Sequence, residues 1–273
     1  MAGERRRSQR ADGGAVPVLS ARPGGPAERF AHAIGLRHPA AVFFVALLSA
    51  FVVLAAISLL LALFVTDVLV HAGGVGRADE SVVESIVADR TPFLTDASEV
   101  GSTVGGAPVL PIIVGLVALV CAFMRKWRIA AFAVFVLVVE SATYRVTSLL
   151  VPRDRPSVHR LENLPVDASY PSGHTAASIA VYAGLVLLLT SAVPSRPVRY
   201  VAWAAAVVLP IFVAMSRMYR GMHHPLDVAG GVLVGIGALL ALLFACRAAE
   251  AAVHAPARSR SRVARGGRMQ AAS

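Results

Sequence analysis

The stretch Tyr170-Pro171-Ser172-Gly173-His174 stands between a polar loop and an apolar run that begins at Thr175. Serine, glycine and histidine at the N-terminus of a helix can bind an oxyanion, because backbone N–H groups there lack partners and the helix dipole favours negative charge. The same residues also fit a purely structural interpretation, with Ser172 as helix cap and Gly173 in a tight turn. The stretch alone therefore predicts a helix start and leaves a phosphate or sulfate site as one of two interpretations.

Composition sets the class of protein around this stretch. Of the 273 residues, 56% are hydrophobic and only 15% are charged, which is too apolar for a soluble domain of this size. Apolar runs long enough to cross about 30 Å of hydrocarbon predict six transmembrane helices and an all-α membrane bundle. The expected spans are residues 40–70, 104–124, 129–151, 174–193, 198–216 and 225–246. Residues 72–103 form a polar connection, with a short amphipathic surface helix expected to end before Pro92.

The arginines indicate orientation and domain limits. They crowd into residues 1–38, the short links after the second and fourth spans, and residues 249–273. The positive-inside rule places all of these in the cytoplasm, so we expect a disordered basic cytoplasmic tail over 1–38, a six-helix domain over 39–248 and a basic cytoplasmic tail over 249–273. The net charge of +10 does not indicate nucleic-acid binding, since no basic module interleaved with aromatic residues is present.

The loops predicted on the outer side carry arginines that this rule disfavours there. Three segments share this side: Arg153-Asp154-Arg155-Pro156, Pro171-Ser172-Gly173-His174, and the stretch from Ser216-Arg217 to His223 and Asp227. The disfavoured arginines fall in two of the loops, as Arg153, Arg155 and Arg160 in one and Arg217 and Arg220 in the other. A site that needs cations explains them better than chance does. These segments resemble the type 2 phosphatidic acid phosphatase family, related in fold to vanadium-dependent haloperoxidases, whose motifs read KxxxxxxRP, PSGH and SRxxxxxHxxxD.

The second and third motifs are complete, whereas the first is partial. Arg155 and Pro156 are in place, but Ser148 stands where the family has lysine. Arg145, almost one helical turn earlier, and Arg153, next to the site, are the two candidates to supply the missing charge.

Phosphate chemistry suggests a role for each remaining group. Arginine binds phosphate oxygens bidentately and keeps its charge, so Arg155 and Arg217 are the expected clamp, and Ser172 and the Gly173 N–H add donors. The family resemblance implies that His223 attacks phosphorus to form a phosphohistidine and that His174 protonates the leaving oxygen. Asp227, near the start of the sixth helix, is expected to hold the His223 imidazole by a hydrogen bond.

Other polar residues receive more ordinary interpretations. Glu140 lies inside the third span and shares one helix face with Thr143, Tyr144, Thr147 and Ser148, so that face is expected to point into the bundle. A structural hydrogen-bond network is the favoured interpretation of this face, and a functional one is the alternative. No carboxylate cluster has the pattern of a metal site, so we expect neither metal nor cofactor.

Together these features predict an integral plasma-membrane lipid phosphatase that needs no metal and has its active site on the outer side. Expected substrates are phosphatidic acid, phosphatidylglycerol phosphate and polyprenyl phosphates or pyrophosphates, and the sequence does not choose among them. Three alternatives stay open: a phosphotransferase that uses the same site, a non-catalytic membrane protein that binds lipid phosphate, and a haloperoxidase-like vanadate site. The six spans argue against the last, because oxidation of a soluble substrate needs no bilayer.

Overall fold

A computed structural model describes residues 16–163 and 168–254, and every regular element in these ranges is helical. The elements, in chain order, are η2 (Pro17–Leu19), α2 (Pro26–Ile34), α3 (Pro39–Leu63), η3 (Phe64–Leu69), α4 (Val75–Ala88), α5 (Pro92–Val104), α6 (Val109–Phe123), α7 (Trp127–Leu150), α8 (Gly173–Ser178), η4 (Ile179–Ala183), α9 (Gly184–Ala192), α10 (Arg196–Tyr219) and α11 (Pro225–His254). The predicted all-α fold is therefore confirmed.

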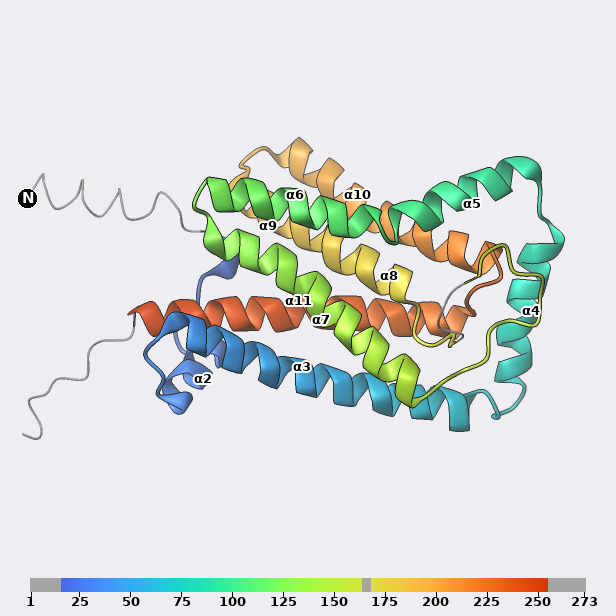
Figure 1. Cartoon of the computed structure of the whole chain (residues 1–273), viewed down its shortest axis with the longest axis horizontal. Helices are drawn as coiled ribbons and strands as arrows, with labels where there is room; N and C mark the ends of the chain where they lie inside the picture. Colours follow the sequence, from blue (N-terminus) through green and yellow to red (C-terminus); the bar gives the residue numbers. More distant parts are fainter. Residues whose placement is uncertain (1–15, 164–167, 255–273) are drawn as a thin grey trace, which may run out of the picture.

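Six helical segments are long and apolar enough to cross a membrane, as the sequence predicted. They are Pro39–Leu69, Pro92–Phe123, Trp127–Leu150, Gly173–Ala192, Arg196–Tyr219 and Pro225–Val253. Figure 1 shows them running along the long axis of the molecule, with α4 lying across one end. Large apolar side chains such as Leu60 and Phe123 cover the outside of the bundle, where acyl chains would contact them in a bilayer.

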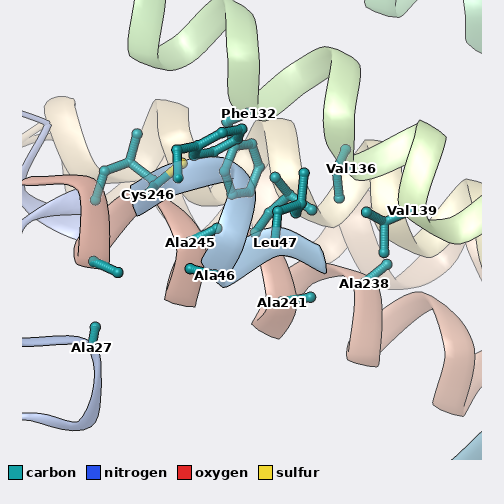
Figure 2. Packing of buried hydrophobic residues seen from close by; sticks show 14 of the residues in the cluster. Ala27, Ala46, Leu47, Phe132, Val136, Val139, Ala238, Ala241, Ala245 and Cys246 are labelled. Atoms are coloured by element: carbon teal, nitrogen blue, oxygen red, sulfur yellow. The ribbon is translucent and has the colours of Figure 1, made fainter. Parts of the chain in front are cut away.

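The centre of the bundle is packed with small side chains. In Figure 2, Ala238, Ala241 and Ala245 of α11 lie against α3 and α7, close to Ala46 and Phe132. Small residues at helix contacts let the backbones approach closely, which is how membrane helices gain packing energy in the absence of a hydrophobic drive. α11 is thus the element around which α3 and α7 are assembled.

The connection over residues 72–103 is more ordered than expected. α4 matches the predicted surface helix and ends before Pro92. A second helix, α5, begins directly at Pro92, where the Thr91 side chain accepts a hydrogen bond from the Leu94 N–H. α5 packs along α10 and buries Ser98 and Ser102, so its polar residues, which suggested a surface connection, face a buried polar site instead.

The N-terminal segment differs from the expected disordered tail over residues 1–38. Residues 1–15 lie outside the described residues, but residues 16–38 fold onto the bundle, with Leu19 fully buried. Arg128 donates to the Leu19 carbonyl at 2.6 Å and Arg247 donates to the Val18 carbonyl at 3.1 Å. The short apolar segment over residues 16–19 was overlooked because the stretch around it is rich in arginine and proline.

The C-terminal helix also extends past the expected domain end at residue 248. α11 continues to His254, and the rest of the expected tail, residues 255–273, lies outside the described residues. The two ends of the described chain lie at the same end of the bundle (Figure 1), opposite the end that carries α4. The three motif segments gather at the α4 end.

Candidate active site

His174 and His223 line one cavity of about 400 Å³ beside α6, α7 and α8. His174 lies in the first turn of α8, and its ring sits so close to Gly106 that a Cβ there would come within 2.5 Å of Nε2. His223 comes from the short loop between α10 and α11. The cavity therefore joins the second and third motif segments, which are about 50 residues apart in the chain, to the junction of α5 and α6.

Two glycines of α11 allow the turn before His174 to approach closely. A Cβ at Gly231 would lie 2.5 Å from the Ser172 carbonyl oxygen, and a Cβ at Gly230 would lie 2.5 Å from the Tyr170 ring. The Ser172 N–H donates to the Asp227 carbonyl at 2.9 Å. Backbone contact between this turn and α11 thus fixes where α8, which carries His174, begins.

Arg217, near the end of α10, is the largest fully buried side chain in the described structure. Its Nη1 donates to Ser102 and, at 2.6 Å, to Glu162. Nε and Nη2 have no hydrogen-bond partner among the described residues. Unsatisfied buried donors on a cation are costly, so this guanidinium is suited to receive an anion.

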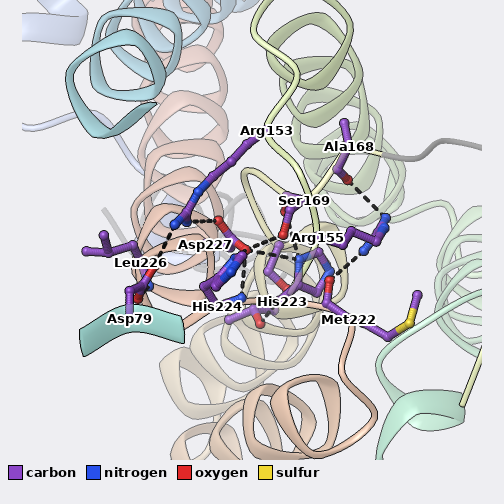
Figure 3. A network of polar contacts seen from close by, with 12 residues as sticks. Asp79, Arg153, Arg155, Ala168, Ser169, Met222, His223, His224, Leu226 and Asp227 are labelled. Atoms are coloured by element: carbon purple, nitrogen blue, oxygen red, sulfur yellow. Dashed lines mark hydrogen bonds and ion pairs between the residues drawn. The ribbon is translucent and has the colours of Figure 1, made fainter. Parts of the chain in front are cut away.

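Arg155 is buried and binds the backbone on both sides of the site. It donates from Nη1 to the Met222 carbonyl at 2.6 Å and from Nη2 to the Ala168 carbonyl at 2.9 Å, as Figure 3 shows. Two of its donors thus tie the loop before α8 to the loop that carries His223.

The His223 ring is oriented by a backbone carbonyl. Its Nδ1 lies 2.7 Å from the Ser169 carbonyl oxygen, which can only accept, so Nδ1 carries the proton and Nε2 keeps its lone pair. Burial lowers the pKa of His223 to about 4, and the imidazole is neutral near pH 7. The prediction of a hydrogen bond between His223 and Asp227 is wrong, because Nδ1 of the ring and Oδ2 of the carboxylate are 3.8 Å apart.

The Asp227 carboxylate, which is fully buried, serves other groups (Figure 3). It accepts from the His224 backbone N–H at 2.7 Å, as expected for an acidic residue in the first turn of a helix, and from the Ser169 hydroxyl. It also pairs with Arg153. These contacts draw the carboxylate away from the His223 ring.

Arg153 does not line the cavity of the two histidines. Its guanidinium bridges Asp227 and Asp79 of α4, with Nη2 2.6 Å from the Asp79 carboxylate. The described contacts thus give this arginine a carboxylate on each side, which does not match the expected phosphate-binding role. Asp79 also accepts from the Leu226 N–H at 3.0 Å, so α4 is fastened to the start of α11.

His224, the residue after the proposed nucleophile, is buried between two carboxylates. Nε2 lies 2.8 Å from Glu80 of α4 and Nδ1 lies 3.2 Å from Asp227. Burial alone disfavours the charged ring, but the carboxylates outweigh it and raise the pKa of His224 above its ordinary value. This ion-paired histidine is a second tie between α4 and the motif loop.

The position of the missing lysine is occupied by a buried hydroxyl. Ser148 donates to the Arg145 carbonyl at 3.3 Å, and it is not among the described residues that line the cavity. Arg145 does line the cavity, together with Gly173 and Tyr144. Ser172, expected to bind phosphate, pairs its hydroxyl with Thr175 at 3.0 Å, is fully buried and is not among the described residues that line the cavity. Of the two candidates for the missing charge, the structure thus brings Arg145 to the histidines.

Glu162 is the site residue that sequence reasoning missed. Its carboxylate accepts from Arg217 at 2.6 Å and from Arg220. Burial alone would raise the pKa of Glu162, but the two guanidinium groups outweigh it and lower the pKa to about 2. The one glutamate in a loop with three arginines was the available signal.

The described residues hold no group of three or more His, Cys, Asp or Glu side chains arranged to bind a metal ion. The polar groups around the cavity are instead guanidinium groups of arginine, the imidazoles of His174 and His223, and backbone N–H groups.

Comparison with known proteins adds family information to this geometry. A model of the PAP2 superfamily matches residues 129–250. Phosphatidylglycerophosphatase B of Bacillus subtilis (strain 168) is 26% identical over 182 residues, which cover 66% of this chain and 89% of the relative. An undecaprenyl-diphosphatase of Sulfolobus acidocaldarius is 33% identical over 123 residues, which cover 43% of this chain and 55% of the relative.

The fold also has a counterpart among solved structures. The crystal structure of a transmembrane PAP2 type phosphatidylglycerolphosphate phosphatase from Bacillus subtilis aligns with a TM-score of 0.59 at 23% identity, covering 76% of this chain and 94% of that one. At this identity, the likeness establishes a shared membrane fold.

Proposed function

We propose, from the match of residues 129–250 to the PAP2 superfamily model, that this chain is a membrane-bound phosphoric ester hydrolase acting on a lipid phosphate. Both curated relatives described above are named as phosphatases of lipid substrates. The proposal covers reaction class and substrate class, and the residues of the site suggest how the reaction would proceed.

The observation that carries the proposal is the meeting of His174 and His223 in one cavity next to Arg217. Arg217 is fully buried, and two of its nitrogens lack a partner among the described residues. A phosphate group would satisfy these donors in a water-poor setting, where charge-assisted hydrogen bonds are strong. Arg145 and the Gly173 backbone, which also line the cavity, are the further phosphate-binding groups that we propose.

In the proposed reaction, the Nε2 lone pair of His223 attacks phosphorus. The P–N bond forms as the ester P–O bond breaks, and His174 gives a proton to the leaving lipid oxygen. Water then hydrolyses the phosphohistidine and releases inorganic phosphate. The neutral state and Nδ1-protonated tautomer of His223 support this role, since both leave Nε2 free to act as the nucleophile.

The remaining polar residues position these groups. Arg155 binds the loops on both sides of the cavity, and Asp227 caps the helix that follows His223. Asp227 also accepts a hydrogen bond from the Ser169 hydroxyl. The backbone carbonyl of the same serine orients the His223 ring. We propose Asp227 as a positioning residue that holds the start of α11 and Arg153 as well as the Ser169 side chain.

We further propose that the site faces the outer side of the plasma membrane, with both termini in the cytoplasm. The short arginine-bearing links after α6 and after α9 lie at the opposite end of the bundle from α4 and the motif loops (Figure 1). This arrangement and the positive-inside rule support the orientation. Lipid headgroups would reach the cavity by lateral diffusion at that depth.

Phosphate release from purified protein tests the proposed function. The protein in detergent with EDTA should release phosphate from at least one of phosphatidic acid, phosphatidylglycerol phosphate and undecaprenyl diphosphate, whereas the His223→Ala variant should release none. Addition of an acceptor alcohol distinguishes hydrolysis from phosphotransfer. Binding of these lipids without turnover would instead indicate a non-catalytic lipid-phosphate receptor.

A further inference from the structure

Glu140 is a buried acidic residue that the proposed mechanism does not use. It lies in α7 within a membrane-spanning segment and is 1% exposed. Its Oε2 accepts from the Ser141 hydroxyl at 3.1 Å, whereas its Oε1 has no hydrogen-bond partner among the described residues. An unpaired buried oxygen costs free energy, so it calls for an explanation by a ligand or a function.

The side chain belongs to the cavity that holds the two histidines. Glu140 lines it together with His174, His223 and Arg145. The other buried hydroxyls on the same face of α7 are satisfied: Thr143 donates to the Val139 carbonyl at 2.8 Å, and Thr147 pairs with Ser58. These hydroxyls thus bond within α7 or to Ser58 of α3, and no hydrogen bond among the described residues joins them to Glu140.

The position of Glu140 along α7 shows how deep its carboxyl lies below the proposed phosphate site. Tyr144 packs against Gly173, whose Cβ position would lie 3.2 Å from the Tyr144 ring, next to His174. Glu140 is four residues earlier in the same helix, which puts it about 6 Å deeper in the span. Leu137, three residues earlier again in α7, lines the cavity below Glu140. With increasing depth, the α7 side of the cavity thus presents the Arg145 guanidinium, the Tyr144 phenol and Ser141 hydroxyl, the Glu140 carboxyl and finally the hydrocarbon of Leu137.

This order of polarity matches one class of lipid phosphate better than the other. In a glycerolipid, the phosphate is followed by a glycerol with ester carbonyls, and only then by hydrocarbon. In a polyprenyl phosphate, hydrocarbon begins directly at the phosphate oxygen. A carboxyl inside a membrane span, with no ion pair to a described residue, is held without charge and can donate a hydrogen bond.

We propose that Glu140 is a specificity-determining residue, whose free carboxyl oxygen hydrogen bonds with an ester carbonyl of a glycerolipid phosphate and so favours that class over polyprenyl phosphates. The inference rests on the proposed phosphatase function and adds the substrate class to it. A substrate without an oxygen at this depth leaves the buried carboxyl unpaired. Sites built to hydrogen bond with a substrate reject analogues that lack the group.

The test compares three substrates that differ at this level. They are dioctanoyl phosphatidic acid, its dioctyl ether counterpart, which lacks both carbonyls, and farnesyl phosphate. The wild type should show a kcat/KM about tenfold higher for the ester than for the ether, the effect of one hydrogen bond. Glu140→Leu should bring the ester down to the level of the ether, mainly through KM, and should leave farnesyl phosphate unchanged or improve it.

Two further variants separate specificity from structure. Glu140→Gln keeps an uncharged donor and should retain most of the preference for the ester. Thr143→Val removes a buried hydroxyl from the same helix face outside the cavity and should leave the ratios unchanged. If Glu140→Leu does not accumulate in the membrane, Glu140→Met, unbranched and close in shape to glutamate, takes its place.

The outcomes are distinct. An equal loss on all three substrates in Glu140→Leu, or equal kcat/KM for ester and ether in the wild type, would overturn the proposal while leaving the phosphatase function intact. Absence of turnover by the wild type of these three substrates and also of phosphatidylglycerol phosphate and undecaprenyl diphosphate would contradict the proposed function itself and this inference with it.

Discussion

The Nδ1 atom of His223 donates to the carbonyl oxygen of Ser169 across 2.7 Å, and this contact sets the state of the proposed nucleophile. A backbone carbonyl cannot take or give a proton, so it holds one tautomer at every pH at which the ring is neutral. Asp227, at 3.8 Å from the ring nitrogen, acts on the Ser169 hydroxyl and on the helix start instead. Ser169 thus orients the His223 ring through its carbonyl, whereas Asp227 holds the loop and the start of α11 in place.

Variants at Ser169 and Asp227 test this division. Ser169→Ala keeps the backbone carbonyl, so the protein should retain most of its turnover. Asp227→Asn leaves buried Arg153 with one carboxylate fewer, and we expect a loss of about 3 kcal/mol in the free energy of unfolding. Denaturant unfolding in detergent measures it.

Asp79→Asn is the matched control for Asp227→Asn. It leaves the Arg153 contact with Asp227 in place, and the amide oxygen can still accept from the Leu226 N–H, so the loss of stability should be smaller. Equal losses in the two variants would contradict the central place of Asp227.

Replacement of the buried arginine should affect chemistry more than folding. Arg217→Lys removes the planar fork and its unpartnered donors, and kcat/KM should fall by about 100-fold or more. Arg128→Lys, at the other end of the bundle, is the control and should leave kcat/KM as it is. A small effect of Arg217→Lys would mean that the phosphate binds elsewhere.

Close backbone packing around the turn before His174 predicts a strong effect of one methyl group. Gly231→Ala should push the Ser172 carbonyl away and displace His174, because the new Cβ would lie 2.5 Å from that oxygen. We expect a large loss of kcat in protein that still inserts into the membrane. Gly115→Ala on α6 meets no atom within 4 Å and should be neutral or slightly stabilising. Phosphate release by both variants, normalised to membrane-inserted protein, checks the prediction.

The lowered pKa of His223 gives stability a defined pH dependence. The folded ring titrates at about 4 against an ordinary value of 6.5, so the unfolded chain takes up this proton first as pH falls. The contribution of His223 to stability is therefore complete above pH 6.5 and is lost as pH falls to about 4. His223→Gln should flatten this part of the curve of Tm against pH, and parallel curves for the two proteins would contradict it.

The orientation can be tested with single cysteines in a protein whose Cys121 and Cys246 are replaced by alanine. Asp154→Cys, in the loop before α8, should react with an impermeant maleimide added to intact cells. Lys126→Cys, in the link between α6 and α7, should react only after permeabilisation. The reverse pattern would place the site on the cytoplasmic side.

Much of the fold was predictable from the sequence, because each apolar run carries its own evidence of a membrane span. The gathering of Arg217, His174 and His223 was predictable through motif spacing. The tie from Arg153 to Asp79 was not, since it joins residues 74 apart in the chain that share no local pattern. Glu162 and Ser102 on Arg217 are contacts of the same kind, and the Ser169 carbonyl is backbone, which no residue type signals.

Trapping of the intermediate tests the central claim, that His223 is the nucleophile of a lipid phosphatase, most directly. Protein mixed with ³²P-labelled phosphatidic acid is quenched in alkali within the first turnover, which preserves phosphohistidine, and is then mapped by proteolysis. The account predicts label on the peptide that contains His223 and no label in His223→Ala. Label on a different residue, or an unlabelled enzyme that still releases phosphate under the same quench, would contradict it.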